Sequence, residues 1–333
     1  MSMPSTPFVW TGRVDADEAG DTTRWHQRIQ PWGSHAREGV ALIGFASDAG
    51  VQRNGGRAGA SEGPQALRRA LASLPVLDEP ALWDAGDVLV AGDDLESAQS
   101  ALADQVARVL SQGALPLVLG GGHEVAWGTF QGIVQGRPAL RRLLIVNFDA
   151  HFDLRQAPMG NSGTPFRQIA DWCADQGRPF EYHVLGISPL GNTRALFDRA
   201  QALGVRYALD EDLQTETGVQ VACDRLVQDL AACDAVYLTV CLDVLPGGQA
   251  PGVSAPAALG VPLATVLALV QPVLASGKLV AADIAELNPA FDHDGLTARV
   301  AARLAATVAR RGRAGPATPR FSAAACPSRH TPD

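Results

Sequence analysis

The sequence lacks the segments that mark membrane and secreted proteins. No apolar run reaches the roughly 18 residues that a transmembrane helix needs. The N-terminal stretch MSMPSTPFVW has neither the basic region nor the apolar region of a signal peptide. The cysteines are odd in number, irregularly spaced and without a Cys-x-x-Cys pair, which argues against a disulfide framework and a zinc ribbon. We therefore expect a soluble protein of the reducing cytoplasm.

Positive charge is also scarce. The formal net charge of −8 at pH 7 argues against nucleic acid or an anionic membrane as a partner. A small anionic ligand is still allowed, because it needs only a local pocket that contains an arginine. The 333 residues are 47 % apolar and 19 % charged, which is typical of a globular protein with one large α/β domain or two smaller ones.

Apolar segments without polar alternation follow one another along the chain, and they predict buried strands. They fall within 39–50, 81–90, 115–121, 142–149, 181–188, 235–243 and 278–286. Helical periodicity predicts helices between and after them, at 95–113, 193–204, 218–232, 263–276 and 296–312. Strands of this kind belong to a sheet that is covered on both faces. Alternation of strands and helices therefore predicts an α/β protein with a parallel sheet.

The motif NFDAHFDLR follows the apolar segment that ends near residue 148. Its Asp149, His151 and Asp153 stand at every second position, so an extended chain places all three on one face. In a parallel sheet, ligands bind beyond the carboxyl ends of the strands, where this motif is expected. Taken alone, the motif is also compatible with a salt-linked structural cluster.

Three other predicted strands end in polar residues in an apolar context. These residues are His123 and Glu124, then Cys241 and Asp243, then Asp283 and Glu286. Oxygen and imidazole groups that converge at one edge of a sheet suit a divalent cation such as Mn²⁺. Each motif alone has another interpretation: GGGHE can be a phosphate-binding loop, and Asp243 or Glu286 can be an ordinary turn or loop residue. Their joint occurrence in this order favours a metal site.

The motifs GGGHE, DAHFD, CLDV and ELNP, in this order, resemble those of the arginase (ureohydrolase) family over residues 39–311. The resemblance implies a three-layer α/β/α fold around a parallel, mainly eight-stranded sheet, with two Mn²⁺ ions at its carboxyl edge. The ligands that it implies are His123, Asp149, His151, Asp153, Asp243 and Cys241. It also implies an N-terminal extension at 1–38 packed on a catalytic domain at 39–311. The Pro- and Ala-rich tail at 312–333 is expected to be disordered.

The stretch NSGTPF (161–166) separates branches of this family. Thr164 and Phe166 stand where arginase-like members carry Asn and a proton-shuttling His, which argues against arginase itself. The stretches WTGRVDADE, GRAGASEGP and VLPGGQAPGVSAPA resemble instead the formimidoylglutamase branch. That resemblance implies Mn²⁺-dependent hydrolysis of N-formimidoyl-L-glutamate to L-glutamate and formamide, a step of histidine degradation.

The implied substrate has a cationic amidine and two carboxylates. In this interpretation Asp153 accepts the proton of the attacking water and Glu286 pairs with the amidinium. Arg155 is the first candidate to bind a substrate carboxylate. Hydrogen-bond candidates on the same loop are Asn161, Ser162 and Thr164. Arg53 and Arg57 are weaker candidates, for which a structural role is favoured.

Cys241 departs from the family pattern, in which a carboxylate stands at this position. A thiolate is a softer ligand than the oxygen that Mn²⁺ prefers. The sequence allows four roles for Cys241 without ranking them. It can be a metal ligand, the cause of a weak second metal site, a redox-sensitive group or a small buried residue.

Two alternative functions follow from the same motifs. One is another amidine or guanidine hydrolase, of the agmatinase or guanidinobutyrase type, whose substrates lack the glutamate α-carboxylate. The other is a non-catalytic ureohydrolase fold that binds metal, favoured by Cys241 and by the missing shuttle His. The family resemblance also implies a homo-oligomer.

Overall fold

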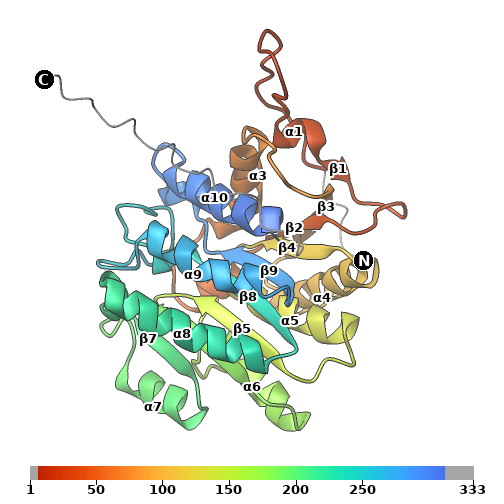
Figure 1. The fold of residues 1–333 in the computed structure, drawn as a ribbon. Coiled ribbons are helices and arrows are strands. Elements are labelled where there is room, and N and C mark those ends of the chain that lie inside the picture. The colour runs from red at the N-terminus through yellow and green to blue at the C-terminus, as the bar shows by residue number, and fades with distance from the viewer. Residues whose placement is uncertain (1–6, 312–333) are drawn as a thin grey trace, which may run out of the picture.

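The computed structural model describes residues 7–311, so the predicted tail at 312–333 lies outside the described residues. A single sheet runs through the molecule in the order β1-β3-β2-β4-β9-β8-β5-β6-β7, and every neighbouring pair is parallel (Figure 1). The strands are β1 (Gln30–Pro31), β2 (Val40–Ala46), β3 (Leu82–Leu89), β4 (Leu115–Leu119), β5 (Leu143–Phe148), β6 (Glu181–Ile187), β7 (Arg206–Leu209), β8 (Ala235–Cys241) and β9 (Leu279–Ala285). The predicted α/β class with a parallel sheet is confirmed; β1, which has two residues, adds a ninth strand at one edge.

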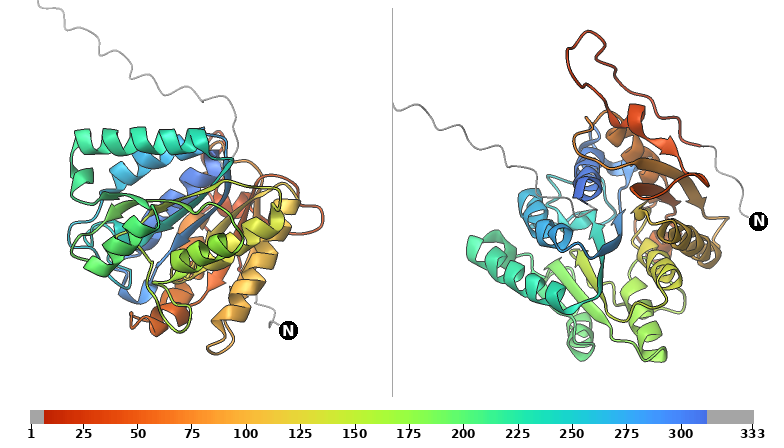
Figure 2. Two further views of the ribbon diagram at one scale, coloured as in Figure 1. Left: turned by 90° about the horizontal axis from the view of Figure 1, so that it is seen from below. Right: turned by 45° about the vertical axis from the view of Figure 1, so that its right-hand side comes forward.

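Helices cover both faces of the sheet. The longer ones are α3 (Gly63–Ala72), α4 (Leu95–Ser111), α5 (Val125–Gly136), α6 (Pro165–Asp175), α7 (Arg194–Ala202), α8 (Glu216–Ala232), α9 (Leu263–Ala275) and α10 (Leu296–Arg311). Side chains of α3, α8, α9 and α10 belong to one buried apolar cluster, and those of α4, α5, α6 and α7 to a second cluster. Figure 2 shows these two layers on opposite sides of the strands. The result is the expected three-layer α/β/α arrangement.

The alternation of side chains along each strand explains the two apolar clusters. In β5, Leu144 and Val146 pack in one cluster, whereas Ile145 between them packs in the other. Both sides of such a strand are buried, so it needs apolar residues at every position. This is the reason that the strand segments read as continuous apolar runs in the sequence.

The order of the strands makes one position of the sheet special. β4 and β5 follow one another in the chain, but β9 and β8 lie between them in the sheet. Beyond β4 the sheet extends through β2 and β3, and beyond β5 it extends in the other direction through β6 and β7. Ligand sites of open parallel sheets lie where the strand order reverses in this way. The loops after β4, β9, β8 and β5 therefore border the expected position of the site.

The N-terminal segment is attached to the first edge of the sheet. Strand β1 pairs with β3, and Trp25 of the short helix α1 (Trp25–Arg28) is fully buried in the core. Trp10 donates a hydrogen bond of 2.7 Å from its indole nitrogen to Asp84. Arg68, also fully buried, forms ion pairs with Asp84 and Asp87. The predicted boundary at residue 38 stays a prediction.

The structure also differs from the sequence-based expectation in detail. Strand β7 was not predicted, because it has four residues and a half-exposed pattern. Within residues 7–311, we find no helix with the length and apolar character needed to cross a membrane.

Candidate metal centre and active site

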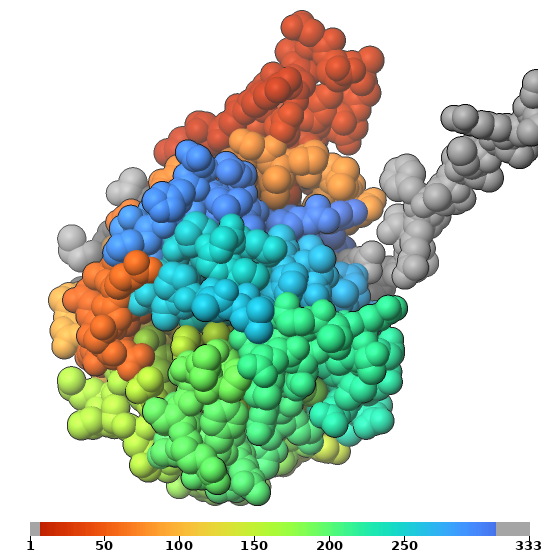
Figure 3. Space-filling model, turned by 90° about the vertical axis from the view of Figure 1, so that its left-hand side faces the viewer, coloured from red at the N-terminus to blue at the C-terminus, as the bar shows by residue number. Residues whose placement is uncertain are grey.

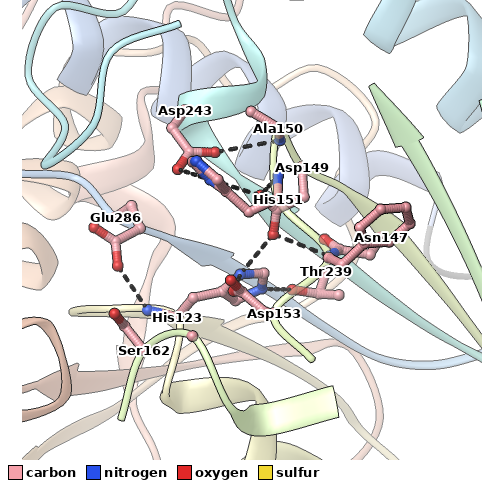
Figure 4. A network of polar contacts seen from close by, with 12 residues as sticks. His123, Asn147, Asp149, Ala150, His151, Asp153, Ser162, Thr239, Asp243 and Glu286 are labelled. Atoms are coloured by element: carbon pink, nitrogen blue, oxygen red, sulfur yellow. Dashed lines mark hydrogen bonds and ion pairs between the residues drawn. The ribbon is translucent and has the colours of Figure 1, made fainter. Parts of the chain in front are cut away.

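Three strand ends near the middle of the sheet deliver the predicted ligands to one place (Figure 4). His123 lies in the loop after β4, and Asp149 comes directly after β5. Cys241 is the last residue of β8, and Asp243 lies in the 3-10 turn that follows. Parallel strands end at the same edge of a sheet, so residues more than a hundred positions apart meet there.

The ligand atoms form two groups that share one carboxylate. His123, Asp149 and Cys241 offer ligand atoms that all lie within 4.8 Å of one another, and so do Asp149, His151 and Asp243. Two groups with Asp149 in common are the arrangement expected for two ions bridged by a carboxylate. The structure therefore brings together all the predicted ligands of these two groups.

Asp153 completes the first group. Its Oδ2 lies 2.9 Å from His123 Nδ1, and Asp149 Oδ2 lies at the same distance from that nitrogen. His123 Nδ1 is buried beside these two carboxylates, and neither contact has the geometry of a hydrogen bond. Asp153 also has a positive φ of 49°, which is uncommon for a residue with a side chain. Backbone strain of this kind is typical of functional sites.

The electrostatics of the cluster favour a bound cation. Burial and the charge of Asp149 raise the pKa of Asp153 to about 6. Burial opposes the ionisation of Asp149, but the nearby imidazole groups of His123 and His151 outweigh it and lower the pKa of Asp149. Carboxylates that crowd together repel one another unless a cation lies between them. Oxygen and imidazole donors in this number fit a divalent ion such as Mn²⁺.

A second layer of polar residues orients His123. Its Nε2 lies 2.9 Å from Thr239 Oγ1, and both groups are buried. Behind Thr239, the buried Asp283 accepts a hydrogen bond from Tyr237 Oη. Asp283 therefore does not join the metal ligands, although the sequence places it at a strand end.

Asp149 is held in a similar way from the opposite side. Asn147 donates from Nδ2 to Asp149 Oδ2 at 3.0 Å and to the hydroxyl of Tyr182 at 2.9 Å. Phe166 stacks on Tyr182 with ring centroids 4.4 Å apart and packs edge-on against His123 at 5.3 Å. Phe166, which stands at the position of the missing shuttle His, is therefore a fully buried support for a ligand.

Glu286 lies just after β9 and borders the ligand cluster. Its Oε1 accepts a hydrogen bond of 2.9 Å from the backbone N–H of His123. It has a positive φ of 71°, the second such strained residue in the site. Burial and the negative charges of Glu124 and Asp243 raise the pKa of Glu286 well above its usual value. The second carboxylate oxygen remains for a ligand.

Cys241 is buried beside these carboxylates. Burial and the charges of Asp149 and Asp243 raise the pKa of its thiol well above the usual value. A neutral thiol is a weak ligand, so ligation by Cys241 requires a cation that favours the thiolate. The structure places its sulfur within the first ligand group, and its role among the four predicted ones stays open.

A cavity of about 190 Å³ lies over the ligands. Arg155, Ser162 and Glu286 line it, as predicted for substrate-binding residues. Asn161 and Thr164 do not line this cavity: Asn161 accepts from Gly163 N, and Thr164 Oγ1 donates within the loop, so both groups shape the turn.

Arg53 and Arg57 have the structural roles that the sequence favoured. Arg53 forms ion pairs with Asp93 and Glu96. Arg57 donates to the backbone carbonyl groups of Val253 and Ser254, which joins two loops over the strand ends. Figure 3 shows the two loops that Arg57 joins side by side, the first in orange and the second in cyan.

Three cavity residues with polar side chains are not indicated as site residues by the sequence: Asn54, Asn192 and Ser254. Asn192 accepts from Phe152 N at 3.1 Å and donates to Ala150 O, so it fixes the loop that carries the ligands. Asn54 donates to Ser162 Oγ. Asn54 and Asn192 lie in loops without a local motif, whereas Ser254 lies within the stretch VLPGGQAPGVSAPA (244–257), which marks the branch of the family but not the role of this serine.

A comparison of the sequence with known families agrees with this geometry. Residues 38–310 match the model of the arginase family. This chain belongs to the arginase family. It is 54 % identical over 319 residues to the formimidoylglutamase of Paraburkholderia xenovorans, covering 92 % of this chain and 99 % of the relative. It is 52 % identical to the formimidoylglutamase of Ralstonia nicotianae, covering 92 % of this chain and 96 % of that relative.

Solved structures of the family have the same fold. The formimidoylglutamase of Bacillus subtilis matches with a TM-score of 0.78 at 24 % identity, over 90 % of this chain and 96 % of that one. The Trypanosoma cruzi formiminoglutamase with Mn²⁺ matches with a TM-score of 0.75 at 25 % identity, over 87 % of this chain and 98 % of that one. Both matches agree with the fold described above.

Proposed function

We propose that this protein is an enzyme that hydrolyses N-formimidoyl-L-glutamate to L-glutamate and formamide. The observation that carries the proposal is a pair of ligand groups that share Asp149, in a cavity that Glu286 and Arg155 also line. Such a cavity has a place for the ions, for a cationic amidine and for a carboxylate. The high identity to formimidoylglutamases supports the choice of substrate.

Two Mn²⁺ ions are the proposed cofactor. His123, Asp149, Asp153 and the Cys241 position would hold one ion, and Asp149, His151 and Asp243 the other. When bound, such ions supply Lewis-acid chemistry that makes a nucleophile from water near neutral pH.

Two carboxylates of the chain have separate proposed roles, one in proton transfer and one in binding the amidinium. We assign to Asp153 the proton of the attacking water, because its Oδ2 borders the first ligand group. Glu286 Oε1 is used by His123 N, so Oε2 is the proposed acceptor for the N–H groups of the amidinium. The positive charge of that group favours the ionised form of Glu286.

Arg155 is the proposed partner of a substrate carboxylate. Its guanidinium is the one Arg or Lys side chain among the described residues that lines the metal cavity. Ser162, which lines the same wall, is the proposed neutral hydrogen-bond donor. Asn161 and Thr164 support this wall from behind through their hydrogen bonds within the loop.

The proposal is tested by formamide release from N-formimidoyl-L-glutamate with added Mn²⁺ and a reductant. Arginine and agmatine serve as comparison substrates. Selective turnover of the first substrate is expected, and selective turnover of agmatine would instead identify an agmatinase-type enzyme. Bound Mn²⁺ without turnover of any of the three would favour the non-catalytic alternative.

The setting of the enzyme is also a proposal. We propose a cytoplasmic homo-oligomer with residues 1–38 as an extension of the catalytic domain at 39–311. The four cysteines within residues 7–311 are free, which agrees with a reducing compartment. The buried Trp25 supports an extension that packs on the core.

A further inference from the structure

We infer that Gly163 is a positioning residue that sets the preference of this enzyme for amidines that carry a carboxylate. It does so by leaving the space through which Arg155 reaches the metal cavity. This inference rests on the proposed function and adds to it a residue that contacts neither the metal ligands nor the amidine. Its basis is the packing of Arg155, Gly163 and Asn54 around one point.

Arg155 lies directly over Gly163. The backbone N–H of Arg155 donates to the carbonyl of Gly163 at 2.9 Å, which ties the two residues together. A Cβ at position 163 would lie 2.7 Å from Arg155 Cδ and 3.2 Å from its Nε. The first distance is shorter than real Cβ contacts, so any side chain at this position displaces the stem of Arg155.

The same space accommodates a second cavity residue. A Cβ at position 163 would lie 3.1 Å from Asn54 Nδ2, the atom that donates to Ser162 Oγ at 3.1 Å. Asn54, Arg155 and Ser162 all line the metal cavity. Gly163 therefore controls how three polar groups are arranged on the wall that faces the substrate.

At position 163 a side chain is excluded by the lack of space and not by the backbone conformation. Gly163 does not have a positive φ, so an alanine fits its backbone without strain. Gly160, three residues earlier in the same loop, also has no positive φ, and a Cβ there would meet only the end of the Gln168 side chain at 3.2 Å or more. The pair provides a matched comparison in which one alanine moves Arg155 and the other does not.

Arg155 is available for a ligand in a way that other arginines of this region are not. No hydrogen bond or ion pair of its guanidinium is found among the described residues, whereas Arg53 and Arg57 are fully engaged nearby. A guanidinium that binds a carboxylate through two parallel N–H groups needs a defined position. A displaced stem removes that geometry while the charge stays on the protein.

The test compares Gly163→Ala with Gly160→Ala on two substrates with Mn²⁺ present. For N-formimidoyl-L-glutamate we expect Gly163→Ala to lower kcat/KM by about 10- to 100-fold, mainly through KM, as a lost charged hydrogen bond does. Turnover of formamidine, which has no carboxylate, should be unchanged, which also shows that the variant is folded. Gly160→Ala should match the wild type on both.

A double mutant separates an effect through Arg155 from a general one. In an Arg155→Ala background, Gly163→Ala should lower kcat/KM much less, because only its contact with Asn54 remains. The inference is overturned if Gly163→Ala behaves as the wild type, if it lowers turnover of formamidine equally, or if its full effect persists without Arg155.

Binding of L-glutamate to the Mn²⁺-loaded proteins, measured by calorimetry, keeps this test independent of the proposed reaction. Weaker binding to Gly163→Ala than to Gly160→Ala supports the role of Gly163 even if the wild type hydrolyses neither amidine, a result that would refute the proposed function alone. Equal binding to the two variants overturns the inference.

Discussion

The hydroxyl of Thr239 lies 2.9 Å from Nε2 of His123, on the side of the ring away from the other ligands. The opposite nitrogen, Nδ1, lies 2.9 Å from carboxylate oxygens of Asp149 and Asp153. When Thr239 accepts the Nε2–H, the Nδ1 lone pair is left for a metal ion. Residues that fix the tautomer of a ligating His in this way contribute to metal affinity.

We predict that Thr239→Val weakens Mn²⁺ binding by about 10- to 100-fold, the usual effect of losing such a partner. Valine fills the same space but leaves Nε2–H buried without an acceptor. Thr239→Ser keeps the hydroxyl and should bind Mn²⁺ as the wild type does. Titration of free Mn²⁺ by electron paramagnetic resonance measures both variants, and equal affinities would show that Thr239 does not orient His123.

A substitution of Cys241 is expected to strengthen Mn²⁺ binding. Its thiol is buried in the first ligand group, where burial and two neighbouring carboxylates disfavour the thiolate. Cys241→Asp places an oxygen ligand, which Mn²⁺ prefers, at the same position. We expect the weaker of the two Mn²⁺ sites to become tighter by about tenfold or more, as one added charged contact allows. An unchanged Mn²⁺ titration would mean that Cys241 is a small buried residue without influence on the metal.

A histidine in place of Phe166 is not expected to extend the substrate range to arginine. It is fully buried between Tyr182 and His123, so a histidine there would point into the core rather than into the cavity. We predict that Phe166→His gives no hydrolysis of arginine and lowers the free energy of unfolding by about 1–3 kcal/mol, the cost of an unsatisfied buried polar group. Urea unfolding and an arginine assay measure this, with Phe166→Leu as the apolar control. Arginine turnover by Phe166→His would contradict the structure.

The sequence indicates where the candidate metal centre lies because its polar motifs directly follow apolar strands, although residues 149–153 form a loop after β5 and not the expected extended segment. Asp149, His151 and Asp153 alternate after an apolar strand, and the parallel sheet then brings them to the other strand ends. The same period would have indicated the second layer: Asn147 stands two residues before Asp149, and Thr239 two residues before Cys241. Asn147 contacts Asp149, and Thr239 contacts His123.

The sequence indicates only part of the cavity wall: it marks Arg155 and Ser162 as candidates, but not Asn54 or Asn192. Asn54 and Ser162 are 108 positions apart, and they meet only because the loops after β2 and β5 fold over the same edge. Loop conformations depend on contacts that the whole fold creates, so no local pattern specifies them. For the same reason Asn161 and Thr164 were assigned to the substrate, although their hydrogen bonds are made within the turn.

Glu124 makes the stability of the metal-free protein depend on pH. Its side chain is fully buried, and Oε1 accepts hydrogen bonds from Ser47 Oγ at 2.8 Å and Gly50 N at 3.0 Å. Burial outweighs these bonds and raises the pKa of Glu124 to about 7. A carboxyl whose pKa is raised on folding binds more protons in the native state, so it lowers stability as pH rises from about 4.5 to 7.

We therefore predict that the free energy of unfolding of Glu124→Gln, relative to that of the wild type, is higher at pH 8 than at pH 5. The difference in unfolding free energy between the two proteins should change by on the order of 2–3 kcal/mol across this range. Urea unfolding in the presence of a chelator measures it at both pH values. Glu18→Gln, which alters an exposed carboxyl, is the control and should show no such change. An equal difference at pH 5 and pH 8 for Glu124→Gln would mean that Glu124 is ionised throughout, and that Ser47 and Gly50 stabilise its charge fully.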